Sequence, residues 1–221
     1  MCGRGVRPDG AELVEMLEAE LVDEEVAALP ARYNLAPTDP VGVLRRDPQR
    51  GRQLSVARWG VPRRRGGIAI NARDDRLRSG LWAPLLRRSR AVVPLLGFYE
   101  WEKPQRQPWY FRRGDGSLLL LAGLVSTDDD GLHTTIVTTD PSSDIGGIHD
   151  RMPAVLEPDC VEPWLMGEDL DMLTSLVQPA VAGTLVRHPV SKAVGNVRND
   201  GPQLIEAVEA TRPPPTQTSL F

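Results

Sequence analysis

Cysteine is scarce in this chain: Cys2 and Cys160 are the only two among 221 residues. Two cysteines cannot build a disulfide framework or a four-cysteine zinc site, and no Cys-x-x-Cys pair occurs. Such sparing use of cysteine is typical of a reducing compartment, where a thiol at position 2 stays reduced. The sequence therefore predicts neither a bound metal nor a cofactor.

Long apolar runs are also missing. No apolar segment approaches ~18 residues, and the N-terminus lacks the basic-then-apolar layout of a secretory signal. Apolar residues make up 41% of the chain and charged residues 25%, which is ordinary for a globular protein. We therefore expect a cytoplasmic protein without a membrane partner.

Lysine is nearly absent, because all but two of the 26 basic residues are arginine. The net charge of −4 conceals a segregation: residues 1–31 carry −6, residues 32–113 carry +13 and residues 114–221 carry −11. A codon bias would explain the choice of arginine, but it would not explain this segregation. Since the planar guanidinium suits phosphates and stacked bases, the middle segment predicts a surface for nucleic acid.

The spacing of apolar residues predicts mostly strands. Residues 9–21 have helical spacing behind a capping Asp9, and further helices are expected at 157–167 and 168–177. Short β-branched or aromatic segments, separated by Gly, Pro and Asp, predict strands at 40–46, 54–60, 91–101, 109–113, 117–125 and 133–139.

These elements predict an α+β fold with a mixed, barrel-like β core and peripheral helices. We assign residues 1–208 to one domain that carries both the chemistry and DNA binding. Residues 209–221 are rich in proline and are expected to form a flexible tail.

The opening "MCGR" places a cysteine directly after the initiator methionine. If Met1 is removed, Cys2 carries a free α-amine and a thiol on adjacent carbons, a pair with chemistry that neither group has alone. Three other polar residues lie beside strand-like or turn-like segments. They are Asn71 in "INAR", Glu100 between two aromatics in "GFYEW", and His149 in the turn "GIHDRMP". A structural role explains each of the three equally well when it is taken alone.

The motifs occur in an order that resembles the SOS-response-associated peptidase family, the abasic-site processing proteins. The resemblance runs from Cys2 to about Glu206. It is carried by "MCGR", "RYNLAP" at 32–37, "WG" and a proline at 59–62, "INAR" at 70–73, "GFYEW" at 97–101, "IHDRMP" at 148–153 and "VSKAVGNVRNDGPQLIE" at 190–206.

The resemblance implies that Cys2, once Met1 is removed, crosslinks to an abasic site in single-stranded DNA. It also implies that Asn71 positions the cysteine amine, and that Glu100 and His149 are catalytic. Arg4 and Arg73 match arginines that engage the DNA backbone. Our candidate DNA contacts are Arg4, Arg73, Trp59, Trp101 and Arg151. Trp59, Trp82 and Trp101 are the tryptophans that could stack on a base.

The chemistry of an aminothiol fits this activity. A neutral amine attacks the sugar aldehyde to give a Schiff base, and the α-amine has a reference pKa of about 7.7–8.0. The neighbouring thiol can then close a five-membered thiazolidine in an intramolecular step. Glu100 is placed as the proton shuttle, and His149 serves the sugar oxygen or the leaving water.

The sequence also departs from the family pattern. Position 5 is Gly where an aromatic is usual, the segment after Gly60 is short, and Asp74, Asp75 and Arg76 follow "INAR" in place of a common Glu-Thr. These departures affect the expected DNA groove rather than the catalytic residues.

Two other functions use the same residues. Cys2 could be the nucleophile of an N-terminal-cysteine peptidase that acts on proteins or on its own N-terminus, or the chain could be a non-catalytic single-strand binding module. The substrate distinguishes these functions from crosslinking, since only the crosslinking hypothesis requires an aldehyde-bearing oligonucleotide.

The last five residues, "QTSLF", resemble peptides that dock on the bacterial replication sliding clamp. Gln217, Leu220 and Phe221 would carry this contact at the end of a flexible tether. We expect a monomer that works at the bacterial nucleoid or replication fork.

Overall fold

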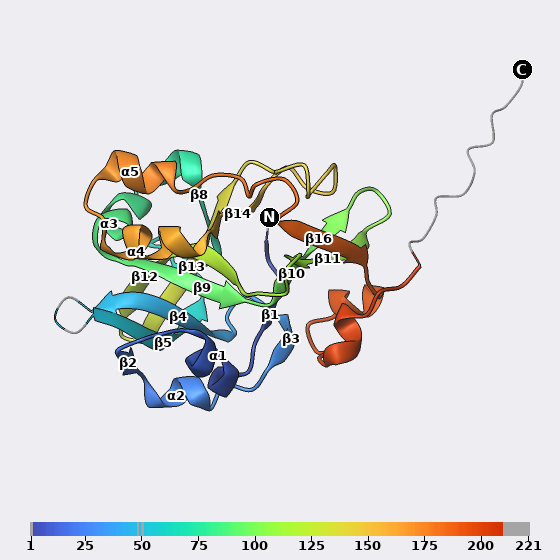
Figure 1. Ribbon diagram of the computed structural model, residues 1–221, viewed down its shortest axis with the longest axis horizontal. Helices are drawn as coiled ribbons and strands as arrows, with labels where there is room; N and C mark the ends of the chain where they lie inside the picture. The colour runs from blue at the N-terminus through green and yellow to red at the C-terminus, as the bar shows by residue number, and fades with distance from the viewer. Residues whose placement is uncertain (1, 48, 50, 210–221) are drawn as a thin grey trace, which may run out of the picture.

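Five strands close into a barrel at the centre of the protein (Figure 1). We describe the fold from a computed structural model, which covers residues 2–47, 49 and 51–209. Consecutive neighbours in the barrel pair antiparallel, and β13 closes the ring by pairing parallel to β5. The predicted α+β fold with a mixed, barrel-like core is therefore confirmed. The barrel strands are β4 (Pro40–Asp47), β5 (Gly51–Trp59), β9 (Arg90–Leu95), β12 (Leu119–Asp128) and β13 (Gly131–Thr139).

Alternation along the strands divides the barrel's apolar residues between two cores. In β9, Ala91, Val93 and Leu95 face an inner core, whereas Val92 faces an outer core. This follows from the period of two in a strand, which sends successive side chains to opposite faces. The outer core is covered by α3 (Trp82–Arg88), α4 (Pro158–Met166) and α5 (Leu170–Ser175).

A second sheet carries the N-terminus. Its order is β16 (Leu185–Pro189), β11 (Gln107–Arg113), β10 (Gly97–Glu102), β1 (Gly5–Arg7) and β3 (Arg32–Leu35). Gly97 begins β10 where the chain leaves the barrel, and a Cβ there would lie 2.4 Å from the Phe111 carbonyl oxygen. Because β1 is hydrogen-bonded on both sides, to β10 and to β3, it holds the preceding residues 2–4 in a defined position.

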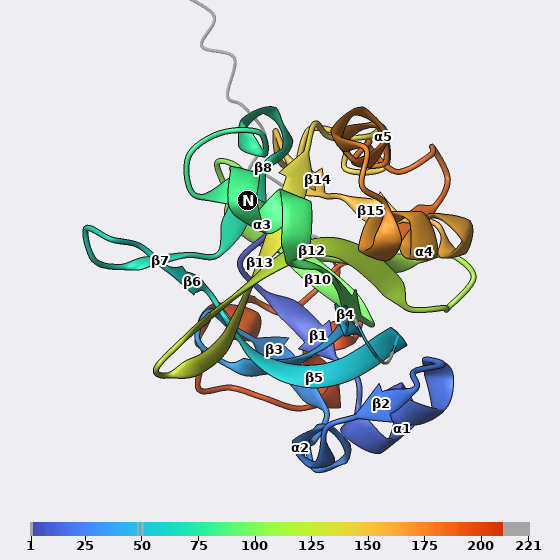
Figure 2. The same ribbon diagram turned by 90° about the vertical axis from the view of Figure 1, so that its left-hand side faces the viewer.

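The remaining elements are short. The β6–β7 hairpin projects from the barrel and is clearest in Figure 2. The other short elements are α1 (Gly10–Met16), β2 (Leu21–Val22), α2 (Glu24–Ala27), β6 (Val61–Pro62), β7 (Ile68–Ala69), β8 (Asn71–Arg73), β14 (Met152–Pro153) and β15 (Val155–Leu156), with 3-10 turns η1 (Asp74–Arg76), η2 (Lys192–Gly195) and η3 (Pro202–Ile205).

Two predicted elements were wrong in extent. The helix expected over 9–21 is capped by Asp9 as predicted, but it ends at Met16, because the following chain extends to pair β2 with β5. The strand expected over 91–101 is two strands, β9 and β10, which belong to different sheets. Three strands of the second sheet, β1, β3 and β16, were not predicted.

Within residues 2–47, 49 and 51–209, every helix is too short or too polar to cross a bilayer. The sliding-clamp prediction falls on Gln217, Leu220 and Phe221, which lie outside the described residues, as does Met1.

Candidate active site

Cys2 lies in the inner core and is completely buried. The Asn71 amide donates a hydrogen bond from Nδ2 to the Cys2 carbonyl oxygen, at 2.9 Å. Apolar residues Ile145 and Ile148 belong to the same core, so the loop that precedes His149 packs on the same side of the barrel as Cys2. The structure thus brings together residues that are far apart in the chain.

Strand β8 positions Asn71 by pairing parallel to β13. Asn71 lies opposite Ile136 and Arg73 lies opposite Thr138, so the side chains of Asn71 and Thr138 share one face of the sheet. Asn71 Oδ1 and Thr138 Oγ1 are both buried, and neither has a hydrogen-bond partner among the described residues. Buried polar atoms are normally paired, and two unpaired ones on one face are suited to receive a polar group.

Glu100 approaches Cys2 from β10. Gly5 pairs with Phe98, and the Tyr99 amide donates to the Arg4 carbonyl oxygen at 3.1 Å; continued further, this register sets residue 3 opposite Glu100. The Glu100 side chain is buried, and this burial raises the pKa of its carboxyl group to about 7. Burial, followed by the nearby charge of Glu100, raises the pKa of the Cys2 thiol well above its usual range.

His149 follows two glycines that both have positive φ, 34° at Gly146 and 75° at Gly147. The imidazole Nδ1 accepts a hydrogen bond from the Arg151 amide at 3.0 Å and lies 2.9 Å from Asp150 Oδ1. Nδ1 therefore faces both an amide donor and a carboxylate acceptor. Burial lowers the pKa of His149, which favours the neutral ring at pH 7.

Arg151 is a buried structural anchor, whereas a contact with DNA was predicted for it and stays a prediction. Its guanidinium binds Asp140 at 2.8 Å, and also Asp74 and the Thr138 carbonyl oxygen. With these partners the side chain is only 7% exposed. Arg151 therefore ties the His149 loop to η1 and β13.

Trp59 also differs from its predicted role as a stacking group. The ring is 1% exposed, and Nε1 donates to the Ile70 carbonyl oxygen at 3.0 Å. No face of the ring is open to a base. Trp101 is half-buried and packs beside Tyr99 in a cluster away from the barrel, so it retains some exposed surface.

The two predicted arginine contacts are both engaged within the protein. Arg4 donates to Asn34 Oδ1 at 2.8 Å and to the Val194 carbonyl oxygen at 2.9 Å. The exposed Arg73 forms a two-pronged ion pair with Asp75, in which both hydrogen bonds measure 3.0 Å.

A pocket of about 280 Å³ lies beside Asn71. Sequence reasoning proposed Asn71, Arg73 and Trp82 but missed Arg63 and Arg76, although the positive charge of residues 32–113 pointed to arginines of this kind. Ile68 of the β6–β7 hairpin also lines this pocket. The pocket is lined by Arg63, Ile68, Ile70, Asn71, Arg73, Arg76 and Trp82.

The mixed barrel brings the Asn71 carboxamide and the Glu100 carboxyl group to the buried Cys2. The chain belongs to the SOS response associated peptidase (SRAP) family, whose sequence profile matches residues 1–197. Among the described part of the chain, no group of three or more His, Cys, Asp or Glu side chains could hold a metal ion.

Two relatives support this assignment, and a solved structure shares the fold. The abasic site processing protein YedK of Escherichia coli is 31% identical over 94% of this chain and all of its own length. YoqW of Bacillus subtilis, also named an abasic site processing protein, is 30% identical over 94% of this chain and all of its own length. A Bacteroides thetaiotaomicron protein shares the fold, with a TM-score of 0.75 and 18% identity over 95% of this chain and 100% of its own.

Proposed function

We propose that this protein processes abasic sites in single-stranded DNA, and that Cys2, after removal of Met1, forms a covalent thiazolidine crosslink with the lesion. The observation that carries the proposal is the convergence of Cys2, Asn71 and Glu100, joined by the hydrogen bond from Asn71 to the Cys2 carbonyl. The names of the relatives support the same substrate.

The first step is attack of the α-amine on the aldehyde of the ring-opened sugar. The new C–N bond forms first, and loss of water then leaves an imine. A buried carboxyl group with a pKa of about 7 can both accept the amine's proton and return it to the departing oxygen. Glu100 is therefore the proton shuttle of this step.

The amine reacts first in this order, because the imine must form before the sulfur can close a ring on its carbon. The thiol follows as a neutral group, which agrees with the burial that raises its pKa. In the second step the sulfur bonds to the imine carbon, and the thiol proton passes to the imine nitrogen. The product is a neutral five-membered ring, and no further reactant is needed.

Asn71 and His149 support these steps. Asn71 was predicted to hold the cysteine amine, but its Nδ2 instead holds the Cys2 carbonyl, which leaves Oδ1 to accept a hydrogen bond from the amine. The neutral His149 can donate from Nε2 to the sugar oxygen. Both residues act as neutral groups, so neither adds a charge beside the amine.

The pocket beside Asn71 is our candidate path for the DNA strand. It combines three exposed arginines, Arg63, Arg73 and Arg76, with the half-buried Trp82. Guanidinium groups bind phosphates, and an aromatic ring offers a stacking surface to a base. This path replaces Trp59 with Trp82 as the candidate stacking residue.

The peptidase hypothesis uses the same residues. A cysteine peptidase attacks through its thiolate, a form that burial of the Cys2 thiol disfavours. The hypothesis predicts cleavage of a peptide substrate, and the binding-module hypothesis predicts DNA binding without any covalent product.

Denaturing electrophoresis of the processed protein with an abasic single-stranded oligonucleotide tests the proposal. Wild-type protein should give a shifted band, Cys2→Ala should give none, and a variant that retains Met1 should give none. Cys160→Ala is the matched control, because Cys160 lies on α4, and it should crosslink as wild type does. A covalent adduct that persists in Cys2→Ala would refute the assignment.

Sliding-clamp binding by Gln217, Leu220 and Phe221 stays a prediction, as do the monomeric state and the single domain over 1–208. A clamp pull-down with and without the last five residues tests the first of these.

A further inference from the structure

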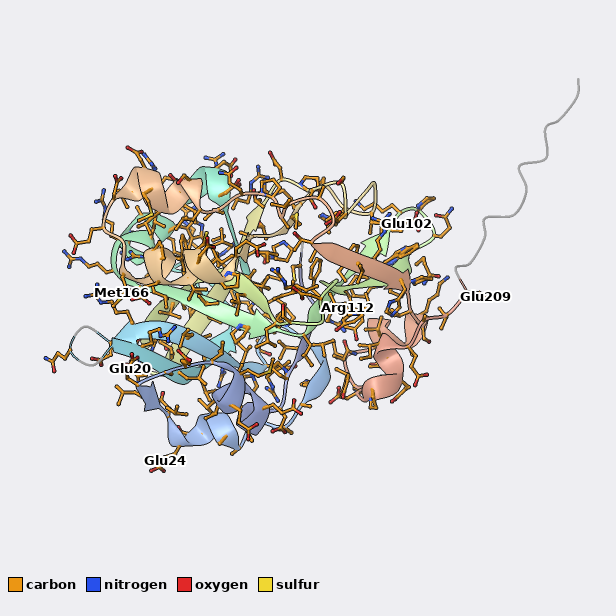
Figure 3. The ribbon with its side chains drawn as sticks, in the orientation of Figure 1. Glu20, Glu24, Glu102, Arg112, Met166 and Glu209 are labelled. Atoms are coloured by element: carbon orange, nitrogen blue, oxygen red, sulfur yellow. The ribbon has the colours of Figure 1, made fainter. Side chains whose placement is uncertain are left out.

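A second arginine-lined pocket lies outside the candidate active site. It has a volume of about 440 Å³ and is formed where the ends of β4 and α3 meet the start of β9 and the end of α4. Figure 3 labels Met166, one of its lining residues, near one end of the molecule. We call it the arginine pocket, after Arg45, Arg46, Arg87, Arg88 and Arg90.

Arg90 forms the buried floor of this pocket. It is 6% exposed, and it donates only to backbone carbonyl oxygens, at the C-terminal ends of α3 and α4. No carboxylate neutralises it directly among the residues that the structure describes. Its positive charge is thus fixed in place, while its donors hold the two helix ends that shape the pocket.

The rim carries three exposed arginines, Arg46, Arg87 and Arg88. None of the three forms a side-chain hydrogen bond or an ion pair with any described residue. The charge of Arg46 also lowers the pKa of Arg90, after the larger effect of burial, so the arginines around the pocket repel one another. Against these charges the lining includes one carboxylate, Glu168.

Neutral hydrogen-bond donors complete the lining. Ser89, Ser126 and Thr127 bring hydroxyl groups into the same pocket. Guanidinium groups together with hydroxyls are the donors that bind phosphate oxygens in proteins. An anion placed among them would relieve the repulsion between the arginines.

The arginine pocket is separate from the site around Cys2. Arg90 begins β9 and Leu95 ends it, and it is Leu95 that approaches Gly5 of β1. At a rise of about 3.3 Å per residue, the two ends of β9 lie roughly 17 Å apart. A phosphate in the arginine pocket therefore could not contact the same sugar as Cys2.

We propose that the arginine pocket is a second binding site, which takes phosphate groups. The phosphates belong either to a nucleic-acid strand that continues past the candidate active site or to a free polyphosphate. The site does not depend on crosslinking, because it needs neither Cys2 nor an abasic sugar.

The test compares two variants that each lose two positive charges. Arg46→Gln/Arg88→Gln alters the pocket rim, and Arg112→Gln/Arg198→Gln alters exposed arginines elsewhere (Arg112 is labelled in Figure 3). In the strand arm, affinity for a long oligonucleotide without abasic sites is measured against salt. Each lost contact should make the slope of log K against log salt shallower by about 0.7 in the pocket variant only.

In the free-anion arm, pyrophosphate is the probe and the melting temperature is the readout. It should rise for wild type and for the Arg112/Arg198 control, and the rise should be lost in the pocket variant. A change confined to the first arm identifies strand phosphates, and a change confined to the second identifies a free polyphosphate. If the pocket variant matches the control in both arms, the proposal is wrong. Failure of crosslinking would leave both measurements unaffected.

Discussion

The region around Cys2 and the arginine pocket hold their polar groups in opposite ways. Around Cys2 the carboxyl group, the thiol and the carboxamide oxygen are buried, and burial shifts the pKa values of Glu100 and Cys2. In the arginine pocket, Arg46, Arg87 and Arg88 are exposed. The chain therefore keeps its reactive groups buried around Cys2 and places these three arginines at a separate, exposed site.

The separation has a physical basis. Proton transfer benefits from a group whose pKa lies near the working pH, and burial supplies that shift for Glu100. Long-range attraction of phosphates needs charges that remain in contact with solvent. One surface could not provide both environments for the same side chains.

The largest expected effect comes from Glu100→Gln, which tests whether the buried region carries the chemistry. The amide keeps the shape but cannot transfer a proton, so the crosslinking rate should fall by about 10²–10⁴-fold. The wild-type rate should also change with pH around 7, and the variant should keep only the dependence that belongs to the α-amine. Single-turnover crosslinking across pH provides both numbers. A variant that reacts at the wild-type rate would remove Glu100 from the mechanism.

Glu100→Gln also tests the raised pKa of Glu100, through the way the free energy of unfolding changes with pH. Its pKa is raised from 4.5 to about 7, so the folded state holds a proton that the unfolded state releases between these values. Wild-type stability should therefore fall as pH rises from 4.5 through 7, by about 3 kcal/mol relative to Glu100→Gln. Urea unfolding of both proteins at a series of pH values measures the difference, and parallel curves would contradict the raised pKa.

Replacing Arg151 by Met tests its role as an anchor rather than a DNA contact. Loss of its bonds to Asp74 and Asp140 should reduce the free energy of unfolding by about 2 kcal/mol. The exposed Arg112→Met is the control and should change stability by less than about 0.5 kcal/mol. Unchanged stability together with weaker DNA binding would restore the original prediction for Arg151.

The smallest effect is expected for Asp75→Asn. This substitution removes the partner of Arg73, so that Arg73 becomes unpaired like the exposed arginines of the arginine pocket. Asp75 occupies the fork of Arg73 that a phosphate would otherwise use. Freeing Arg73 should tighten binding of single-stranded DNA, by less than about tenfold. Fluorescence anisotropy measures the change. Asp115→Asn, which removes an exposed partner of Arg113, has the same charge change and should have no effect.

Much of the fold could be predicted because the strand pattern is local. The segments around β4, β5, β12 and β13 are short apolar or β-branched stretches bounded by Gly, Pro and Asp, and the structure has strands there. The short strands β1 and β3 have little pattern of their own, and they form because β10 and the neighbouring chain offer them partners. The early end of α1 has the same cause, since pairing of β2 with β5 competes with the helix.

The candidate site shows the same division. The motifs around Cys2, Asn71, Glu100 and His149 identified those residues, but not which atoms meet. The hydrogen bond from Asn71 Nδ2 to the Cys2 carbonyl oxygen depends on the pairing of β8 with β13. The burial of Trp59 and Arg151 depends on the closed barrel and on the carboxylates of Asp74 and Asp140.

The sequence by itself determined the family, the strand-rich class of fold, the cysteine at position 2 and the positive charge of residues 32–113. Only the tertiary structure decided which arginines are buried, which are paired and which line the arginine pocket. The reason is that charge and residue type belong to single positions, whereas burial and pairing arise when distant segments pack together.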